Sequence, residues 1–405
     1  MWHVKNGFEK VSGLLDGYSN DMVGTMRGMI PIRAISPTNG GSGESKRADF
    51  LEGVIKGWGI ETKRIEYTDG NSVGRPNLIS RLGDAERTIW FAVHMDTVTE
   101  GDPAAWKRDP YTATVDGDRI YGRGTNDNGQ ALISSLYAMK ALKESGLKMR
   151  FNFGLLLVSD EEEGSKFGMQ PLMGEGIFGK DDMFVVPDWG TENGGLIELG
   201  EKGMLWLRVS VAGKQVHAST PAEGCNAFRY MVRFLDRVDR HLHEKYGGTN
   251  TIFNPPYSTF EMTKHERGVE SINIIPGMET AYIDCRVLPE YGLDGVIADV
   301  MEIASGKDFS AVKITVDTVN RSDAAKETDK GSEIASMLHG ALADLRGIDA
   351  GFTGIGGGTC AAFPRKADYN AVVWSTLHEV AHQPNEFASV NDMLGDSKVF
   401  AYLCL

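Results

Sequence analysis

Five residues of this 405-residue chain carry side chains that commonly bind divalent metal ions, and each lies where a predicted strand ends or a predicted helix begins. They are His94, Asp127, Glu162, Asp188 and His382. Ligands of open α/β sheets bind beyond the carboxyl ends of the strands, so we expect these side chains at one rim. Imidazole nitrogens and carboxylate oxygens suit zinc or a similar ion when thiolates are absent.

Each of these residues also has an ordinary alternative role. Asp127 could cap a helix, Asp160–Glu163 could be a solvated acidic turn, and His94 could be a hydrogen-bonded core histidine. Only the combination of all five at one rim favours a metal site.

A charge count favours two ions at this site. The carboxylates of Asp127, Glu162 and Asp188 together with one hydroxide balance two divalent cations. Zinc is the metal we predict, and cobalt and manganese suit the same ligands. Asp96 lies two residues beyond His94 and can return a carboxylate to the second imidazole nitrogen, which would fix its tautomer. Such a site can polarise a substrate carbonyl and activate water for hydrolysis.

Two other motifs could carry a different chemistry. His378-Glu-Val-Ala-His382 matches the H-E-x-x-H zinc-protease motif, which needs both histidines on one helical face. A strand-like run ends at Trp374 and Pro384 follows, so at most one helical turn fits there and Glu379 should not be critical. The segment Gly354-Ile-Gly-Gly-Gly-Thr359 lacks a dinucleotide fingerprint. It could present backbone N–H groups, around Gly357, Gly358 and Thr359, to a carboxylate, and it could be a tight strand-to-helix turn; the two roles are compatible.

The elements that must position these residues alternate between strands and helices, which predicts a mixed, mostly parallel sheet between helices, of the α/β class. The apolar run Thr88–Val93 is typical of a strand buried on both faces, and apolar residues at helical spacing predict a helix over 131–142. Further predicted elements are helices at 1–28 and 47–58 and strands at 151–158, 183–186 and 371–374.

The middle of the chain has a different pattern. A strand at 205–211, a helix at 226–244, extended segments, a helix at 293–305 and a strand at 312–318 follow a β-α-β-β-α-β order. We therefore predict an inserted α+β, ferredoxin-like domain at 203–322, flanked by two parts of a catalytic domain, 1–202 and 323–405. The polar run Asn320–Lys330 is interpreted as the return linker.

Composition argues against several classes of protein. The net charge is −14 and Lys and Arg form no stripe, so a nucleic-acid partner is not expected. No apolar stretch approaches the roughly 20 residues that span a bilayer, and no signal region is apparent. The four cysteines form no C-x-x-C pair. We expect a cytoplasmic protein that acts on a small molecule.

Taken together, the motifs resemble the co-catalytic zinc metallohydrolase family of succinyl-diaminopimelate desuccinylase, acetylornithine deacetylase, aminoacylase and glutamate carboxypeptidase. The matching segments run in the family's order: Val93–Thr97, Tyr121–Gly129, Ser159–Ser165, Val186–Trp189 and Ala381–Glu386. The resemblance implies that Asp127 bridges the two ions, that Glu162 is a ligand, and that Glu161 is the general base. As a base, Glu161 would take a proton from water and pass it to the leaving amine.

The resemblance also implies that the inserted domain is a lid through which the chain forms a homodimer. His217 would then reach the partner's active site and stabilise an oxyanion. Asn273 and Arg286 match segments that hold substrate, although Arg286 could equally form a salt bridge within the lid.

The substrate expected first is N-succinyl-diaminopimelate. N-acetylornithine, N-acyl amino acids and small peptides are alternatives. A non-catalytic binding protein on the same scaffold is a further alternative, against which the complete ligand set and Glu161 argue.

Overall fold

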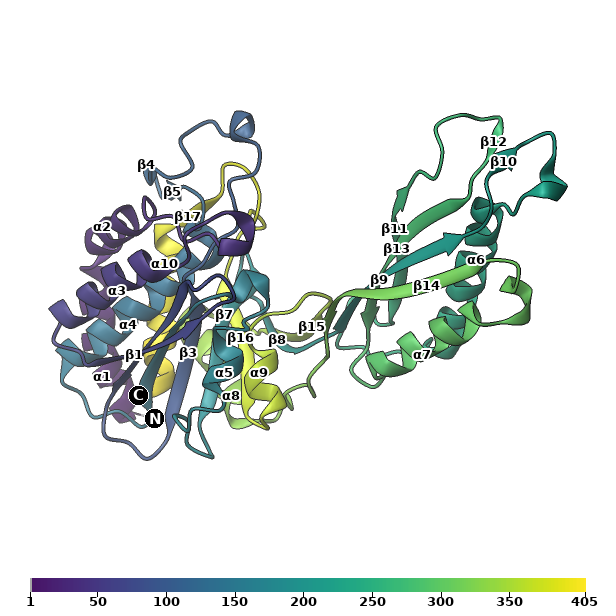
Figure 1. Cartoon of the computed structure of the whole chain (residues 1–405). Helices are drawn as coiled ribbons and strands as arrows, with labels where there is room; N and C mark the ends of the chain where they lie inside the picture. The colour runs from purple at the N-terminus through teal and green to yellow at the C-terminus, as the bar shows by residue number, and fades with distance from the viewer. Residues whose placement is uncertain (1) are drawn as a thin grey trace. The chain divides into compact units, whose positions relative to one another are not determined.

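The computed structural model describes residues 2–405, with side chains from residue 7 onward, and it separates into two compact units (Figure 1). Unit 1 is built from the chain up to Leu199, from Thr328–Phe352 and from Thr359–Leu405. Unit 2 is built from Gly200–Glu327 and Thr353–Gly358. The chain therefore leaves unit 1 and later returns to it, so unit 1 is assembled from segments that are far apart in sequence.

The main sheet of unit 1 confirms the predicted mixed α/β class. Its strand order is β1-β2-β6-β3-β7-β16-β8-β15. The central strands β6, β3, β7 and β16 are parallel, whereas β1, β2 and β8 pair antiparallel at the flanks. The strands are β1 Thr62–Thr68, β2 Gly74–Leu82, β3 Thr88–His94, β6 Asn152–Val158, β7 Met183–Thr191, β8 Leu196–Glu201, β15 Gly351–Ile355 and β16 Asn370–Thr376.

Helices cover both faces of this sheet, so the central strands are buried on both sides. Along β3, Trp90 and Ala92 face one core and meet the layer of α5 and α9. Phe91 points to the other face, where its ring centroid lies 5.1 Å from that of Phe400 on α10. On that face α4 and α10 pack on the sheet, with α1, α2 and α8 against them. These helices are α1 Trp2–Asp16, α2 Ser19–Met29, α4 Ala131–Ser145, α5 Met169–Leu172, α8 Glu333–Arg346, α9 Ala362–Lys366 and α10 Val390–Cys404.

The single helix predicted over 1–28 is wrong, because two helices occupy this stretch. Its predicted first residue, Met1, lies outside the described residues. α1 ends at Asp16 and α2 begins at Ser19. Between them, Gly17 and Tyr18 donate their N–H groups to the carbonyls of Leu14 and Leu15 in tight turns. Glycine weakens a helix and favours such turns, but Gly13 lies inside α1 and Gly24 inside α2, so Gly17 contributes to the break without explaining it alone. The helix predicted at 47–58 is α3, Ser45–Gly57, which packs on β1 and β2.

Unit 2 contains an antiparallel sheet with strand order β11-β13-β9-β14 and two helices. The elements follow the β-α-β-β-α-β order, apart from the short pair β10 and β12. In β9, alternate residues from Leu205 to Val211 enter a core that α6 and α7 cover. The elements are β9 Gly203–Ala212, β10 Val216–His217, α6 Ala227–Lys245, β11 Thr259–Glu266, β12 Ile274–Ile275, β13 Met278–Val287, α7 Leu293–Ala304 and β14 Lys313–Ser322.

The predicted start of the return linker at Asn320 is wrong by three residues. Asn320 and Ser322 pair with β9 opposite Trp206 and Met204. This end of β14 is exposed, so polar residues are suitable there and do not by themselves indicate a loop.

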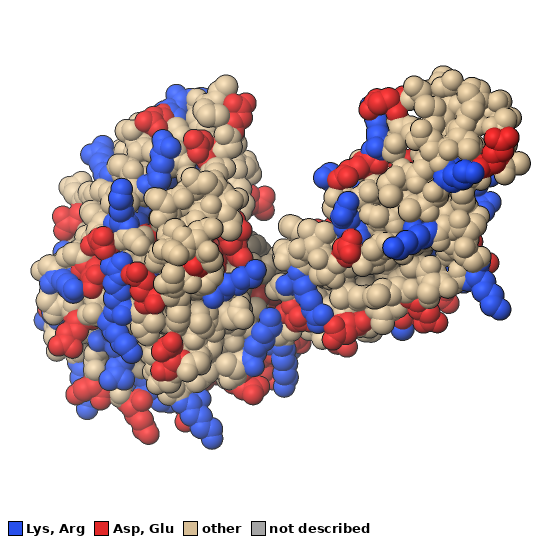
Figure 2. All heavy atoms as spheres, in the orientation of Figure 1, with Lys and Arg blue, Asp and Glu red and all other residues tan. Residues whose placement is uncertain are grey.

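The surface carries both charge signs. Figure 2 shows Lys and Arg interspersed with Asp and Glu over the visible face of each unit. Within residues 2–405, no helix is long and apolar enough to cross a membrane. No disulfide joins Cys225, Cys285, Cys360 or Cys404, all of which lie within residues 2–405.

Candidate metal centre

All five residues predicted as metal ligands belong to unit 1, and the structure brings them together at the carboxyl ends of the parallel strands. His94 is the last residue of β3. Glu162 lies in a 3₁₀ turn, Glu161–Glu163, that follows β6. Asp127 lies in the turn before α4, and His382 lies in the loop after β16. Residues from far-apart segments therefore meet because parallel strands end on one edge.

Asp188 reaches this edge through an irregularity in β7. The strand does not end at Val186, as the sequence suggested, but runs to Thr191. Val186 pairs with Val373 on β16, and the next pair is Gly190 with Ser375. Three residues of β7 therefore stand opposite one residue of β16. Such a bulge redirects side chains, which explains how Asp188 faces the centre from within a strand.

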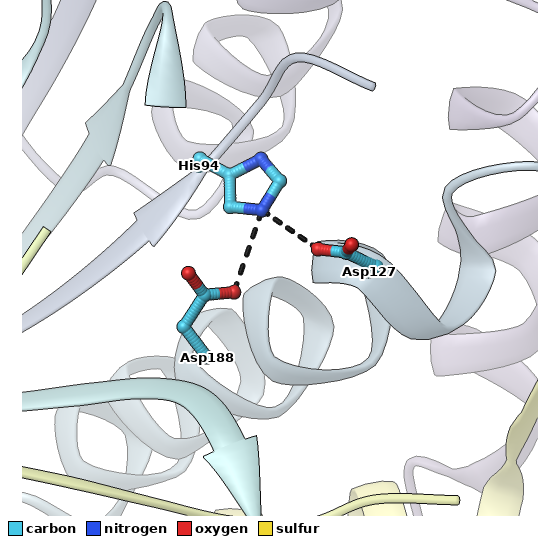
Figure 3. A group of neighbouring side chains, drawn as sticks. All are labelled: His94, Asp127 and Asp188. Carbon is cyan, nitrogen blue, oxygen red and sulfur yellow. Dashed lines mark hydrogen bonds and ion pairs between the residues drawn. The ribbon is translucent and has the colours of Figure 1, made fainter. Parts of the chain in front are cut away.

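The first cluster of possible ligands contains His94, Asp127 and Asp188. Both carboxylates point at the Nε2 atom of His94 (Figure 3). Asp127 Oδ1 lies 2.9 Å and Asp188 Oδ1 lies 3.4 Å from this nitrogen. Asn128 donates to Asp188 Oδ1 at 2.5 Å, which orients that carboxylate. The side chain of His94 is only 1% exposed, so the cluster has little access to bulk water.

The second cluster contains Asp127, Glu162 and His382. His382 Nε2 lies 3.0 Å from Asp127 Oδ2 and 3.1 Å from Glu162 Oε2. Asp127 is therefore shared, with one oxygen directed at each histidine. Glu161 belongs to neither cluster.

Asp96 supports both the histidine and the acidic turn. Its backbone carbonyl lies 3.0 Å from Nδ1 of His94, and its carboxylate lies farther away, at 3.5 Å. The sequence predicted that the Asp96 carboxylate would contact Nδ1 of His94. In the structure the backbone carbonyl of Asp96 makes the closer contact. The carboxylate instead accepts the N–H groups of Glu161 and Glu162 at 3.1 and 3.0 Å. Asp96 therefore holds the backbone of Glu161 and Glu162 in place at the start of the 3₁₀ turn.

The electrostatics of the centre require positive charge. Burial, reinforced by Asp188, raises the pKa of Glu161 well above its ordinary value. Burial likewise raises the pKa of Glu162 and of Asp188. Hydrogen bonds to Asp127 and Glu162 raise the pKa of His382 to about 10. For His94, burial opposes protonation, but Asp188 and Asp127 outweigh it and the pKa rises. Crowded, partly buried carboxylates are unfavourable without cations, so this donor set suits metal ions.

A buried ion pair between Glu386 and Arg123 lies beneath Asp127, and the sequence interpretation gave it no role. Glu386 is 0% exposed. Its carboxylate accepts the N–H groups of Gly124, Asn126 and Asp127 at 2.9–3.0 Å. Burial raises the pKa of Glu386 to about 7, although Arg123 opposes this rise. The only sequence signal was the position of Glu386 at the end of the segment that contains His382.

The H-E-x-x-H match at 378–382 is not helical. No helix covers any of these residues. His378 faces Glu192 and Asp392, at 3.1 and 3.5 Å, whereas His382 faces the second cluster. Glu379 is exposed. The zinc-protease alternative therefore fails on geometry.

The remaining predicted site residues lie mainly in unit 2. His217 on β10 is exposed, and its Nδ1 lies 2.7 Å from Ser219 Oγ. Pairing of β10 with β12 places His217 beside Asn273, whose carbonyl accepts the N–H of Ala218 at 2.9 Å. These contacts bring His217, in β10, and Asn273, directly before β12, side by side.

Arg286 forms the salt bridge within its own unit that was the alternative role. It binds the carboxylate of Asp284 at 2.6 and 2.9 Å and the carbonyl of Gly356 at 3.0 Å. Gly357 and Gly358 follow that carbonyl and have open space where a Cβ would stand. Thr359 belongs to unit 1, and its hydroxyl accepts the N–H of Ala361 at 3.1 Å.

Two histidines and three carboxylates that converge at the rim of an α/β sheet form a donor set that could hold divalent metal ions, as in metallohydrolases. Comparisons with known proteins agree. The model of peptidase family M20/M25/M40 matches residues 90–405. An uncharacterized metallohydrolase of Methanocaldococcus jannaschii is 35% identical over 392 residues, which cover 92% of this chain and 96% of the relative. A succinyl-diaminopimelate desuccinylase of Gluconacetobacter diazotrophicus is 26% identical, covering 96% and 98%.

Solved structures of peptidases share the fold. A tripeptidase from Staphylococcus aureus superposes with a TM-score of 0.76 at 19% identity, covering 95% of this chain and 97% of the other. The chain belongs to peptidase family M20/M25/M40. It is a metal-dependent hydrolase of amide or peptide bonds.

Proposed function

We propose that this enzyme holds two divalent ions, zinc in the first instance, and hydrolyses an N-acyl or peptide bond in a small substrate that bears a carboxylate. The observation that carries the proposal is the shared Asp127. One of its oxygens lies 2.9 Å from His94 Nε2 and the other lies 3.0 Å from His382 Nε2. A carboxylate placed between two clusters is the arrangement expected of a bridging ligand.

The donor set fits this proposal. His94, Asp127 and Asp188 would hold one ion, and Asp127, Glu162 and His382 the other. When bound, such ions polarise the substrate carbonyl and lower the pKa of water toward about 7. Neutral imidazoles and ionised carboxylates are the forms that bind metal ions. Without metal, burial raises the pKa of Glu162 and of Asp188, whereas hydrogen bonds to His382 and His94 lower the pKa of Asp127.

Glu161 serves as the general base in this mechanism. It lies in neither ligand cluster, and its neighbours Asp188 and His94 place it beside the first. Its carboxylate takes a proton from the attacking water and passes it to the leaving amine. Asp96 holds the backbone of Glu161 in place through a 3.1 Å hydrogen bond.

For the substrate we propose an N-acyl amino acid, with N-succinyl-diaminopimelate as the first named compound. Relatives named succinyl-diaminopimelate desuccinylase support this choice. Arg286 would bind the substrate carboxylate through a bidentate contact, in exchange for its bonds to Asp284. Small peptides are the second candidates, because the structural relatives include a tripeptidase.

We further propose a homodimer through the lid, residues 203–322. Phe228 and Val232 lie one helical turn apart on α6 and are 49% and 52% exposed. Such paired apolar residues on one helix face favour burial against a partner. The partner's His217 would then stabilise the oxyanion. Phe228→Glu should convert a dimer into a monomer in sedimentation analysis, and a monomeric wild type would refute this point.

The test of the function is metal analysis combined with a substrate panel. Wild-type protein purified without chelator should contain about two divalent ions per chain and release amine from at least one panel member. The panel holds N-succinyl-diaminopimelate, N-acetylornithine, N-acyl amino acids, dipeptides and tripeptides. Wild-type protein that binds no zinc, cobalt or manganese and cleaves nothing would overturn the proposal.

A further inference from the structure

The turn that carries Asp127 is held from below by one buried carboxylate. Asp127 has φ −110° and ψ 99°, which is not helical, although it lies directly before α4. Because the turn leaves helical geometry, its N–H groups cannot all bond to helix carbonyls. Glu386 supplies the acceptors instead, since its Oε2 receives Gly124 N–H and its Oε1 receives the N–H groups of Asn126 and Asp127.

The counterion of Glu386 reaches a second ligand-bearing segment. Arg123 donates from Nη1 to Glu386 Oε2 at 2.7 Å and from Nη2 to the backbone carbonyl of His382 at 3.3 Å. Its side chain is 2% exposed. His382 has φ 62°, a conformation that is uncommon for a residue with a side chain. Arg123 therefore ties the strained segment of His382 to the turn of Asp127.

We propose that Glu386 and Arg123 are positioning residues that fix the geometry of the cluster formed by Asp127, Glu162 and His382. The pair contacts the backbone of two of its three members and touches none of their ligand atoms. This inference rests on the proposed metal function and adds to it. Loss of the pair loosens two ligands at once, so the affinity for metal falls even when the chain stays folded.

The test compares Glu386→Gln with a matched variant at a remote carboxylate. Asp182 is also buried and also accepts three N–H groups, from Thr88, Trp90 and Gly179, each at 2.8 Å. It lies at the amino ends of β3 and β7, opposite to the metal centre. Asp182→Asn therefore reproduces the loss of a buried acceptor without touching either ligand cluster.

The readouts are Zn²⁺ affinity by competition with a chromophoric chelator and the absorption spectrum of bound Co²⁺. Both are measured at a temperature where circular dichroism shows each variant folded. Supporting groups behind metal ligands typically contribute about 10–100-fold to affinity. We expect Glu386→Gln to weaken the weaker-bound Zn²⁺ by that factor and to alter the Co²⁺ spectrum. Asp182→Asn should leave both unchanged.

Arg123→Lys provides a second variant in case Glu386→Gln does not fold. It keeps the positive charge beside Glu386 and loses the planar fork that reaches His382. We expect a smaller weakening in the same direction. Wild-type affinity and spectrum in the folded variants, or equal losses in Asp182→Asn, would overturn the inference. If the wild type itself binds no metal, the proposed function fails instead.

Discussion

Replacement of Glu161 by glutamine tests the proposed role as general base independently of the roles of the neighbouring metal ligands. Gln has nearly the same shape as Glu but cannot take up a proton. The hydrogen bond to Asp96 is made by the backbone N–H of Glu161, at 3.1 Å, so the turn survives the change. Because Glu161 belongs to neither ligand cluster, the variant should retain its metal content.

The size of the effect follows from the role. A positioned general acid or base contributes about 10²–10⁴-fold to rate, which corresponds to about 3–5 kcal/mol of activation free energy. We expect kcat of Glu161→Gln to fall by this factor while KM changes little, because the loss concerns the chemical step. Glu162→Gln should differ in kind, because it removes a predicted ligand and should lower the metal content.

The assay measures amine release under saturating substrate, together with metal per chain by elemental analysis. Glu379→Gln is a suitable control, because Glu379 is an exposed carboxylate of the H-E-x-x-H segment. It should retain wild-type turnover. If Glu161→Gln keeps both its metal and its full activity, the base is misassigned. If Glu161→Gln loses metal while Glu162→Gln retains it, the two roles must be exchanged.

Three further predictions concern the ligands and the strand beneath them. Asp188→Asn should lower the metal content from two ions toward one, whereas Asp127→Asn should weaken both sites; elemental analysis distinguishes the two. In chelator-treated protein, hydrogen bonds to Asp127 and Glu162 raise the pKa of His382 to about 10. The stability from this imidazolium is present in full below about pH 6.5 and is lost as the pH rises through 10, so the Tm gap between wild type and His382→Gln should shrink over that interval. Gly190→Ala would place a Cβ 1.8 Å from the Ser375 carbonyl oxygen, and urea unfolding should show a loss of at least about 1–3 kcal/mol.

Regular patterning in the sequence predicted the fold class. The run Thr88–Val93 is apolar at every position except Thr88, as expected of a strand buried on both faces, and β3 occupies it. Glycine at position 17 was a weaker signal, since one glycine is tolerated in many helices. The end of β14 was missed because exposed strand residues and linkers share a polar composition.

The candidate site was predictable to the extent that its residues follow strands. His94 comes directly after one apolar run and Glu162 lies four residues after another, which ends at Val158, so the topology rules locate both. The bulge that turns Asp188 towards the centre depends on the register with β16, which no local pattern encodes. Pairing of Arg123 with Glu386 joins residues 263 positions apart, and one sequence alone carries no signal for such a contact.

The discontinuity of unit 1 has a consequence for how the centre assembles during synthesis. His94, Asp127, Glu162 and Asp188 precede the inserted unit, and His382 follows it. A nascent chain that ends within residues 200–327 lacks His382, which lies 220 residues after Glu162. It also lacks β16 and Glu386, which position Asp188 and the turn of Asp127, so neither cluster is complete at that stage. Closing a loop of that length costs conformational entropy that grows only slowly with length. Where the chain leaves and re-enters unit 1, the N–H of Thr328 donates to the carbonyl of Leu199 at 2.8 Å, so the two ends of the insertion lie side by side. Folding of the inserted segment into a unit with adjacent ends would therefore favour the closure that completes both clusters.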